Sequence, residues 1–405
     1  MTDVTTPAVT AQPLPSDLRM ARALGPVLLA SAVGLLPFTV FSTFLVPIAA
    51  EAGSGVAAMG GLRGLGGLAA LAVGAALAPL IDRVSKHYVA AAGLALLGVS
   101  SALGASGEFL AMVVFCVLVG AGTSILGPAL TAAAADRFGD GQAAGRAATL
   151  VTATQSLTAM LAAPLIALPA LFWGWQGNLV AVAVISLVLA VVFTRRRPVA
   201  AGPAKPQIGY LATLRALTAV PGAVPLLAVA LLRTGAFMGY LSYLAAVYAE
   251  RFSLSPGPFA LVWTLSGGAF FVGNLLAGRF TNSATPWIGP ERMLVISLVV
   301  ALGAVVGFYF APVLPLALLM TMLLGASHAT VAACVVTLLV QRCGPLRGSA
   351  LGLNAAGMSL GVFLGSAFGG LGLGIAGYPG TAVALGGMTL IALVCAMRVR
   401  SVISV

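Results

Sequence analysis

The residues that could do chemistry within this chain are few, and they are cationic or neutral. All nine acidic residues fall in predicted tails, loops or helix ends, so none is placed to relay protons through an apolar interior. Three other ionisable side chains lie inside long apolar stretches, namely Arg63, Arg233 and His328. An arginine offers paired hydrogen-bond donors to a carboxylate, sulfonate or phosphate, and a histidine can titrate near physiological pH. These residue types favour anion recognition, with proton transfer at His328 as a second hypothesis.

The elements that hold these side chains are long and apolar. Of the 405 residues, 60% are hydrophobic and 7% are charged, and the mean hydropathy is +1.10. Soluble domains carry about 25% charged residues, so a chain with so few charges could not cover a soluble surface. The apolar runs lack period-two alternation, and a segment in lipid must satisfy its own backbone hydrogen bonds. The sequence therefore predicts an all-α membrane protein and not a β-barrel.

Apolar runs long enough to cross a bilayer core of about 30 Å are best counted as twelve, with eleven as the alternative, because only short turns separate two of the pairs. The predicted spans are residues 24–48, 56–80, 88–106, 109–134, 147–170, 175–194, 221–249, 257–277, 293–310, 312–340, 348–373 and 380–397.

The basic residues fix an expected orientation. With both termini in the cytoplasm, all but three of the 20 lysines and arginines face the cytoplasm; the exceptions are Arg251 on the outer side and Arg63 and Arg233 within spans. This asymmetry follows the positive-inside rule. The net charge of +11 therefore reports topology and does not indicate nucleic-acid binding. We expect a multi-pass protein of the plasma (inner) membrane with both termini cytoplasmic.

A polar stretch in the middle of the chain separates two sets of six spans. We expect a disordered cytoplasmic tail over residues 1–18, an N-terminal six-helix bundle over 19–194, a cytoplasmic linker over 195–220 and a C-terminal six-helix bundle over 221–405. Internal similarity supports a duplication. The segments LVGAGTS and LLGASHA are similar, and their alignment places Gly120 opposite Gly325.

Arg233 lies about ten residues into its predicted span, where an arginine costs about 2.5–3.5 kcal/mol on insertion scales unless it meets water or a partner. At the helical angle of about 100° per residue, Phe237 and Tyr240 share its face, and Gly235 and Gly239 lie opposite. Small residues at this spacing indicate a close helix-packing seam. Two interpretations stay open: a binding-site wall with a cation at its centre, or a structural arginine bonded to carbonyls of a neighbouring helix.

The other two ionisable residues also leave two interpretations each. Arg63 lies in the outer third of its span, where it could contact substrate or extend toward the outer surface. His328 could couple transport to protons, or it could be a neutral hydrogen-bonded residue. A second ladder of small residues consists of Gly357, Gly361, Gly365 and Gly369, and it indicates close packing within the bundle. Because the ladder packs internally, we expect a monomer.

No cofactor is indicated by the sequence. No cluster of His, Cys and carboxylate residues has metal-ligand spacing, and no Gly-rich phosphate-binding loop ends in Lys-Ser/Thr. A membrane-embedded enzyme would need convergent catalytic groups, and no carboxylate lies within a span. We therefore expect no catalytic residues, no metal and no cofactor.

Residues 78–87 read APLIDRVSKH and resemble the hallmark of the major facilitator superfamily, G-x-x-x-D-R-x-G-R-K/R, in the loop after the second span. The matching residues are Asp82, Arg83 and Lys86. The equivalent loop of the second half keeps Gly278 and Arg279. The resemblance implies that these five residues form a latch, which holds two helices together in one conformation and releases them in another.

Two further segments resemble this family. The residues WGWQ at 173–176 are similar to its G-W-R motif, and residues 243–279 are similar to bacterial drug and sugar efflux members. The resemblance implies twelve helices in two bundles, alternating access, and a cavity lined by spans 1, 4, 7 and 10. The substrate-binding residues would then be Arg233, Phe237, Tyr240, His328 and Arg63.

The leading functional hypothesis is a secondary transporter that exports a small amphipathic or partly anionic compound across the lipid bilayer, with protons as a candidate coupling ion. Uptake or exchange of an organic or inorganic anion is the alternative within transport. It is favoured by Arg63, by Arg233 and by the absence of acidic residues within the spans. A non-transporting membrane receptor or structural protein is the alternative from another class.

Overall fold

The computed structural model describes residues 17–81, 84–138, 142–195, 215–281 and 288–401, and these residues form helices joined by short turns. The helices of the first half are α1 (Asp17–Ala23), α2 (Gly25–Val33), α3 (Leu36–Thr43), α4 (Leu45–Glu51), α5 (Val56–Ile81), α6 (Lys86–Gly104), α7 (Phe109–Asp136) and α8 (Gln142–Thr194). Those of the second half are α10 (Ala223–Phe252), α11 (Pro256–Thr281), α12 (Pro290–Tyr309), α13 (Leu314–Cys343) and α14 (Arg347–Ser401), with the 3-10 turn η1 (Gly344–Leu346) before α14.

The prediction of twelve spans is confirmed once two long helices are divided at their kinks. Gly174 interrupts α8 with a φ of 70°, and Ala376 and Gly377 interrupt α14, with a φ of 62° at the glycine. A positive φ is open to glycine because it has no Cβ. Each helix therefore reverses direction at its glycine and supplies two spans, at the places where the sequence predicted turns.

The first span differs from the prediction of one continuous helix over residues 24–48. It consists of α1 to α4, with breaks at Leu24, around Gly34 and at Phe44. Prolines lie in the first turns of α2 and α3, where the missing N–H costs little. Inside a continuous helix the same prolines would remove backbone hydrogen bonds, so the span is divided into short pieces.

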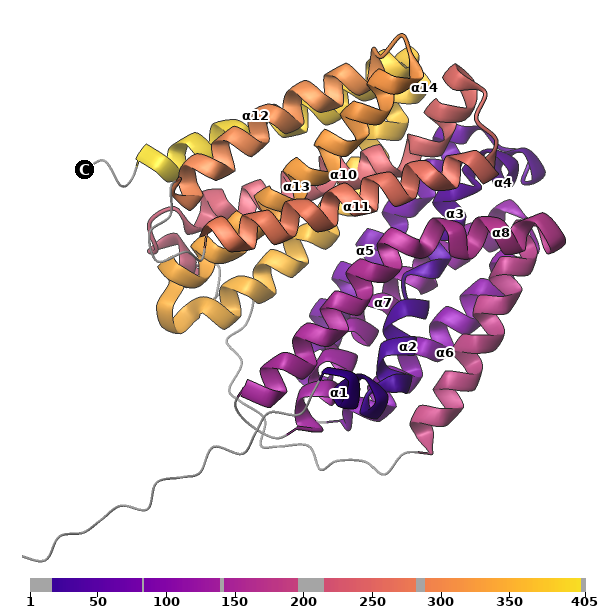
Figure 1. Cartoon of the computed structure of the whole chain (residues 1–405), viewed down its shortest axis with the longest axis horizontal. Helices are drawn as coiled ribbons and strands as arrows, with labels where there is room; N and C mark the ends of the chain where they lie inside the picture. Colours follow the sequence, from indigo (N-terminus) through magenta and orange to yellow (C-terminus); the bar gives the residue numbers. More distant parts are fainter. Residues whose placement is uncertain (1–16, 82–83, 139–141, 196–214, 282–287, 402–405) are drawn as a thin grey trace, which may run out of the picture.

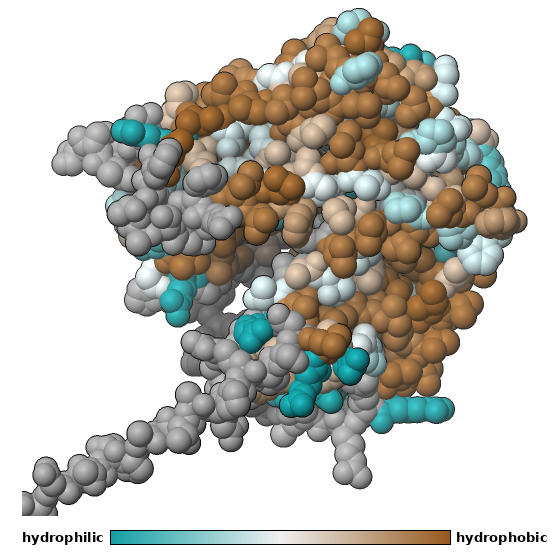
Figure 2. All heavy atoms as spheres, viewed as in Figure 1, coloured by the Kyte–Doolittle hydropathy of each residue, from teal (hydrophilic) through white to brown (hydrophobic). Residues whose placement is uncertain are grey.

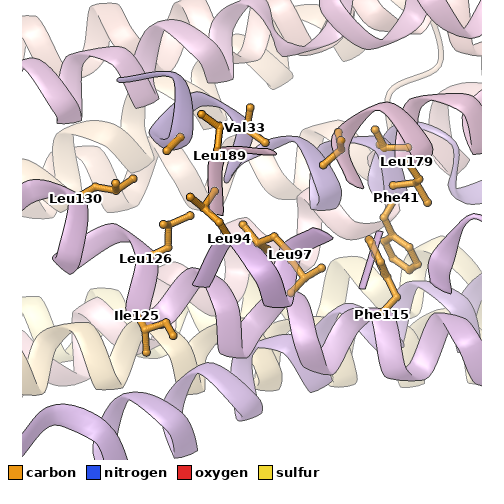
Figure 3. Packing of buried hydrophobic residues seen from close by; sticks show 14 of the residues in the cluster. Val33, Phe41, Leu94, Leu97, Phe115, Ile125, Leu126, Leu130, Leu179 and Leu189 are labelled. Carbon is orange, nitrogen blue, oxygen red and sulfur yellow. The ribbon is translucent and has the colours of Figure 1, made fainter. Parts of the chain in front are cut away.

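The described helices form two bundles, α1–α8 and α10–α14, as the fold-class prediction expected (Figure 1). The buried side chains of α2–α8 make one large apolar cluster, part of which includes Phe41, Leu97, Phe115 and Leu179 (Figure 3). Two clusters fill the second bundle. On the outside, hydrophobic side chains cover most of the visible face, which suits contact with lipid (Figure 2).

The predicted internal duplication is reflected in how Gly120 and Gly325 pack. A Cβ at Gly120, on α7, would collide with the backbone of Gly66 on α5. A Cβ at Gly325, on α13, would lie 2.7 Å from the carbonyl oxygen of Ser266 on α11. Both glycines therefore let the fourth span of a bundle approach its second span at backbone distance.

The small-residue seam predicted opposite Arg233 is also present. A Cβ at Gly239 would lie 2.5 Å from the carbonyl oxygen of Gly365, and one at Gly365 would collide with the backbone of Gly235. The two predicted glycine ladders therefore face each other between α10 and the first part of α14. This contact lies inside the second bundle, where we expected the second ladder to pack.

The two bundles touch mainly through one half of their length. We call the end at which α4 and α10 finish the distal end, and the end at which α1 and α10 begin the proximal end. The contacts join residues 57–67 of α5 to residues 359–370 of α14, and residues 159–167 of α8 to residues 260–267 of α11. The ribbons accordingly converge near α3 and α4 and splay toward α1 and the C-terminus (Figure 1).

Candidate functional site

Arg63 is the intramembrane cation that lies between the two bundles. Its guanidinium donates from Nη1 to Ser42 Oγ at 2.9 Å, on α3 of the same bundle. Nη2 lies 3.7 Å from the sulfur of Met238, on α10 of the other bundle. The guanidinium carbon also stands 5.7 Å from the centre of the Phe38 ring, within range of a cation–π contact. Arg63 is partly exposed, and its charged group on α5 contacts α3 of its own bundle and α10 of the other.

Tyr243 extends from α10 into the first bundle. Its ring is fully buried and belongs to the apolar cluster of α2–α8, although its helix belongs to the second bundle. A Cβ at Gly60 would collide with the ring, and one at Gly370 would lie 2.5 Å from the phenol oxygen. Two glycines, one in each bundle, therefore form a socket for this side chain.

The Tyr243 hydroxyl joins both walls of the socket. It lies 2.9 Å from the carbonyl oxygen of Ser366 on α14 and 3.3 Å from that of Ala57 on α5. The hydroxyl has one proton, so the carbonyls share it. Separation of the bundles at the distal end would pull the ring away from Gly60 and Ala57. The contacts of Tyr243 in the socket therefore oppose the opening of that end.

The two seams between the bundles differ in how closely the backbones approach. At α5–α14, a Cβ on Gly67 would lie 2.6 Å from the carbonyl oxygen of Ser359, and one on Gly64 would lie 3.0 Å from that of Phe363. At α8–α11, Gly267 has a similar approach to Ala159 and Met160. Small residues thus line both seams, but the first seam uses more glycines and allows closer backbone contact.

Arg233 lies inside the second bundle, 4% exposed. Nη1 donates to the carbonyl oxygen of His328 on α13 at 3.2 Å, and Nη2 donates to Thr234 Oγ1 at 2.9 Å. Of the two interpretations drawn from the sequence, these contacts match the arginine bonded to a carbonyl of a neighbouring helix. They come from a single bundle, which distinguishes Arg233 from Arg63.

The aromatic residues predicted beside Arg233 lie in the same enclosed region. Phe237 stacks on the His328 ring, with centres 4.8 Å apart, and on Phe270 at 5.8 Å. The Tyr240 hydroxyl donates to Thr321 Oγ1 at 2.9 Å. His328 is 1% exposed, and neither ring nitrogen has a hydrogen-bond partner among the described residues. The structure brings Arg233, Phe237, Tyr240 and His328 together but places Arg63 apart from them.

Of the predicted latch, Asp82 and Arg83 lie outside the described residues. The backbones of Gly278 and Arg279 continue α11, and Lys86 begins α6. Among the described residues of the proximal end, Arg342 at the end of α13 forms an ion pair with Glu291 at the start of α12, at 3.1 Å. The latch itself stays a prediction.

Sequence reasoning missed Ser42, Met238 and Tyr243 as residues at the junction of the bundles. Tyr243 appears in the sequence only as one more aromatic residue of an apolar span, and nothing there marks it as crossing to the other bundle. The spacing of Gly60, Gly64 and Gly67 was an available signal, because small residues every three or four positions indicate a close helix contact.

The sequence profile of the Major Facilitator Superfamily matches residues 27–345 and 284–403. The chain belongs to this family. The two matched ranges together cover nearly all of both bundles, so membership rests on the whole fold and not on one motif. The family and the structural neighbours identify the chain as a transporter and not an enzyme.

Solved transporters of similar fold share little sequence with this chain. A bacterial homologue of the human lysosomal transporter Spinster, in an inward-facing and occupied conformation, is 14% identical, with a TM-score of 0.73 over 96% of this chain and 98% of that one. A mutant of the nucleoside transporter NupG is 16% identical, with a TM-score of 0.74 over 92% and 99%. The human organic anion transporter MFSD10 (TETRAN) is 19% identical, with a TM-score of 0.62 over 93% and 99%. No match is found among curated protein sequences.

Proposed function

We propose that this chain exports a small amphipathic compound with an anionic group, by alternating access of its two bundles. The observation that supports this most directly is Arg63, a partly exposed residue whose guanidinium lies between the bundles and has partners on both. Ser42 and Met238 leave several of its five N–H groups for a ligand. An anionic group can take a bidentate pair of them, while Phe38 offers an apolar surface to the body of the compound.

Arg233 orders the interior of the second bundle in this proposal. Its guanidinium is enclosed and already bonded within that bundle, so a ligand would have to displace those bonds to reach it. Arg63 needs no such displacement, because its contact with Met238 is a long one to sulfur. We therefore assign the substrate contact to Arg63, the arginine that the sequence predicted nearer the membrane surface.

In this proposal the protein lies in the plasma membrane with its proximal end in the cytoplasm. The reason is the positive-inside rule, because the basic residues of the loops gather at the proximal end. The distal contacts, including the Tyr243 socket, then close the outer side, and the described arrangement faces inward. Cysteine labelling tests this: an impermeant reagent should label a cysteine at Ser54 from outside and spare one at Ala204. The reverse pattern would overturn the orientation.

Export is the direction proposed, from the resemblance to efflux members. Uptake or exchange of an organic anion is the second candidate. It is favoured by a sequence observation: no carboxylate lies within a span to carry a counter-transported proton. Flux of radiolabelled compounds in proteoliposomes of known orientation separates export from uptake, and absence of flux for any compound that binds would point to a receptor.

The test of the anion site uses Arg63→Gln and Arg63→Lys, with matched pairs of radiolabelled aromatic carboxylates and their uncharged amides. Arg63→Gln removes the charge, so we expect it to weaken carboxylate binding by about tenfold or more, equivalent to about 1.4 kcal/mol, and to leave amide binding nearly unchanged. Arg63→Lys keeps the charge and loses the fork, so its loss should be intermediate. Equal losses for carboxylate and amide would contradict the proposal.

A further inference from the structure

Met238 on α10 places its sulfur beside a cation of the other bundle. The Sδ atom lies 3.7 Å from Nη2 of Arg63 on α5, and both residues are partly exposed. Among the described residues, the guanidinium has one oxygen acceptor, Ser42 Oγ at 2.9 Å from Nη1. A thioether sulfur is a weak acceptor, and an arginine has five N–H groups. The Arg63 guanidinium is therefore short of strong acceptors within the described part of the chain.

The distance between the Met238 sulfur and Arg63 suits an oxygen atom carried on that sulfur. N–H···O hydrogen bonds have N···O distances of about 2.7–3.2 Å. Because the S–O···N angle at a sulfoxide oxygen is bent, such an oxygen can lie within that range of Nη2 while the sulfur stays at 3.7 Å. Oxidation of Met238 therefore needs no separation of α5 from α10, and it replaces a weak acceptor with a strong one.

A second sulfur contact provides an internal comparison. The Met358 sulfur lies 3.6 Å from Nδ2 of Asn354, and Met358 is also partly exposed. Both residues belong to α14, and the amide of Asn354 is neutral. A sulfoxide at Met358 would therefore bond a neutral group of its own helix, whereas a sulfoxide at Met238 would bond a cation of the other bundle.

We propose that Met238 is a reversible oxidation site, at which a peroxide converts the thioether to a sulfoxide whose oxygen accepts a charge-assisted hydrogen bond from Arg63. In this step a lone pair of the sulfur attacks one peroxide oxygen and the O–O bond breaks. For hydrogen peroxide, a proton shift then completes the water molecule that leaves. The sulfur loses two electrons and the peroxide gains them. A methionine sulfoxide reductase returns the thioether, with electrons from a thiol.

The sulfoxide has two consequences. It joins α5 to α10 close to the Tyr243 socket, so it stabilises the arrangement in which the distal ends meet. Because hydrogen bonds to charged groups are stronger than neutral ones, the ratio of closed to open molecules should rise about tenfold or more. It also occupies N–H groups of Arg63 that the anion would use, so oxidation should inhibit transport. This second consequence rests on the proposed function, and the first does not.

The experiment treats the full chain in lipid nanodiscs with hydrogen peroxide. Maleimide spin labels at Ala50→Cys on α4 and Gly257→Cys on α11 report the distance between the distal ends, with Cys395→Ser to prevent labelling there. Peptide mass spectrometry reports the oxidation of each methionine. We expect Met238 to be oxidised well before the fully buried Met59, and the short-distance population to rise as Met238 is oxidised. A methionine sulfoxide reductase with dithiothreitol should reverse both changes.

Four variants locate the effect. Met238→Leu cannot be oxidised at this position and should abolish the rise, whereas the matched control Met358→Leu should retain it. Arg63→Gln removes the cation, so oxidation of Met238 should no longer close the distal end. Met238→Gln carries an amide oxygen in place of the sulfoxide and should raise the short-distance population without peroxide. This last variant provides the test if peroxide damages the protein elsewhere.

Three outcomes would overturn the proposal. Oxidation of Met238 no faster than that of Met59 would show that the sulfur is not accessible to peroxide. Complete oxidation without a change in the distance distribution would show that the sulfoxide does not bond Arg63. A rise that persists in Met238→Leu would assign the effect to another residue. The distance measurement uses no substrate, so the oxidation site and the anion site at Arg63 can each fail alone.

Discussion

The two arginines within the membrane differ in what holds them. Arg233 is enclosed by one bundle and donates to His328 and Thr234 of that bundle. Arg63 stands between the bundles, with Ser42 on one side and Met238 on the other. When the bundles move apart, Arg233 can keep all of its partners, whereas Arg63 must lose Met238. Under the proposed alternating access, position relative to the interface between the bundles, and not depth in the membrane, decides which cation can respond to a ligand.

The internal duplication sharpens this difference. Helices α5 and α11 have the same length, and the position of Arg63 in α5 corresponds to that of Trp263 in α11. Trp263 packs edge-on against Phe259, and within the described part of the chain its indole N–H has no hydrogen-bond partner. The two seams between the bundles therefore carry different residues at equivalent positions, and the charge is confined to the seam in which backbones approach most closely.

Alanine substitutions provide the strongest test of the comparison. Arg233→Ala leaves a cavity in a closed interior and removes two hydrogen bonds, so we expect a loss of about 3 kcal/mol in the free energy of unfolding. Arg63→Ala leaves a partly exposed gap that water can fill, so we expect a loss below about 1 kcal/mol. Denaturant unfolding in mild detergent measures both. Equal losses would remove the distinction between the two arginines.

A smaller effect is expected from the hydroxyl of Tyr243. Tyr243→Phe removes the hydrogen bonds that join it to Ser366 and Ala57, so the closed distal end should lose about 1 kcal/mol, about a fivefold change in the conformational equilibrium. Tyr309→Phe is the matched control, because Tyr309 is also fully buried but its hydroxyl has no hydrogen-bond partner in the regions that the structure describes. The distance between spin labels at Ala50→Cys on α4 and Gly257→Cys on α11, measured in lipid nanodiscs, reports both variants. A shift in the control as large as that in Tyr243→Phe would mean that the socket does not hold the bundles together.

The smallest stability change is expected at His328. His328→Phe keeps the stack on Phe237, and the lost nitrogens make no hydrogen bonds to the described residues, so the free energy of unfolding should change by less than about 1 kcal/mol. If His328 couples transport to protons, as the sequence suggested, the pH dependence of flux in proteoliposomes should flatten in this variant and in His328→Gln. A pH profile like that of the unchanged protein would leave His328 as a packing residue.

The sequence predicted the helix count, the two glycine ladders and the duplication because these depend on local composition and spacing, whereas the pairing of the ladders with each other came from the structure. It did not predict the broken first span, although Pro26, Gly34 and Pro37 were visible, since hydropathy alone does not register a break within an apolar run. Phe237 and Tyr240 were correctly grouped with Arg233, because residues four and seven positions apart share a helix face.

What the sequence by itself determined is that this chain is a membrane protein of two six-span halves, because apolar runs of this length can be satisfied only as spanning helices. The tertiary structure alone decided which residues meet across the halves. Arg63 and Met238 lie on different bundles, as do Tyr243 and Gly60. Helix periodicity gives the face of a residue on its own helix, but the partner of that face depends on how the bundles pack, and that packing is set by contacts distributed over the whole chain.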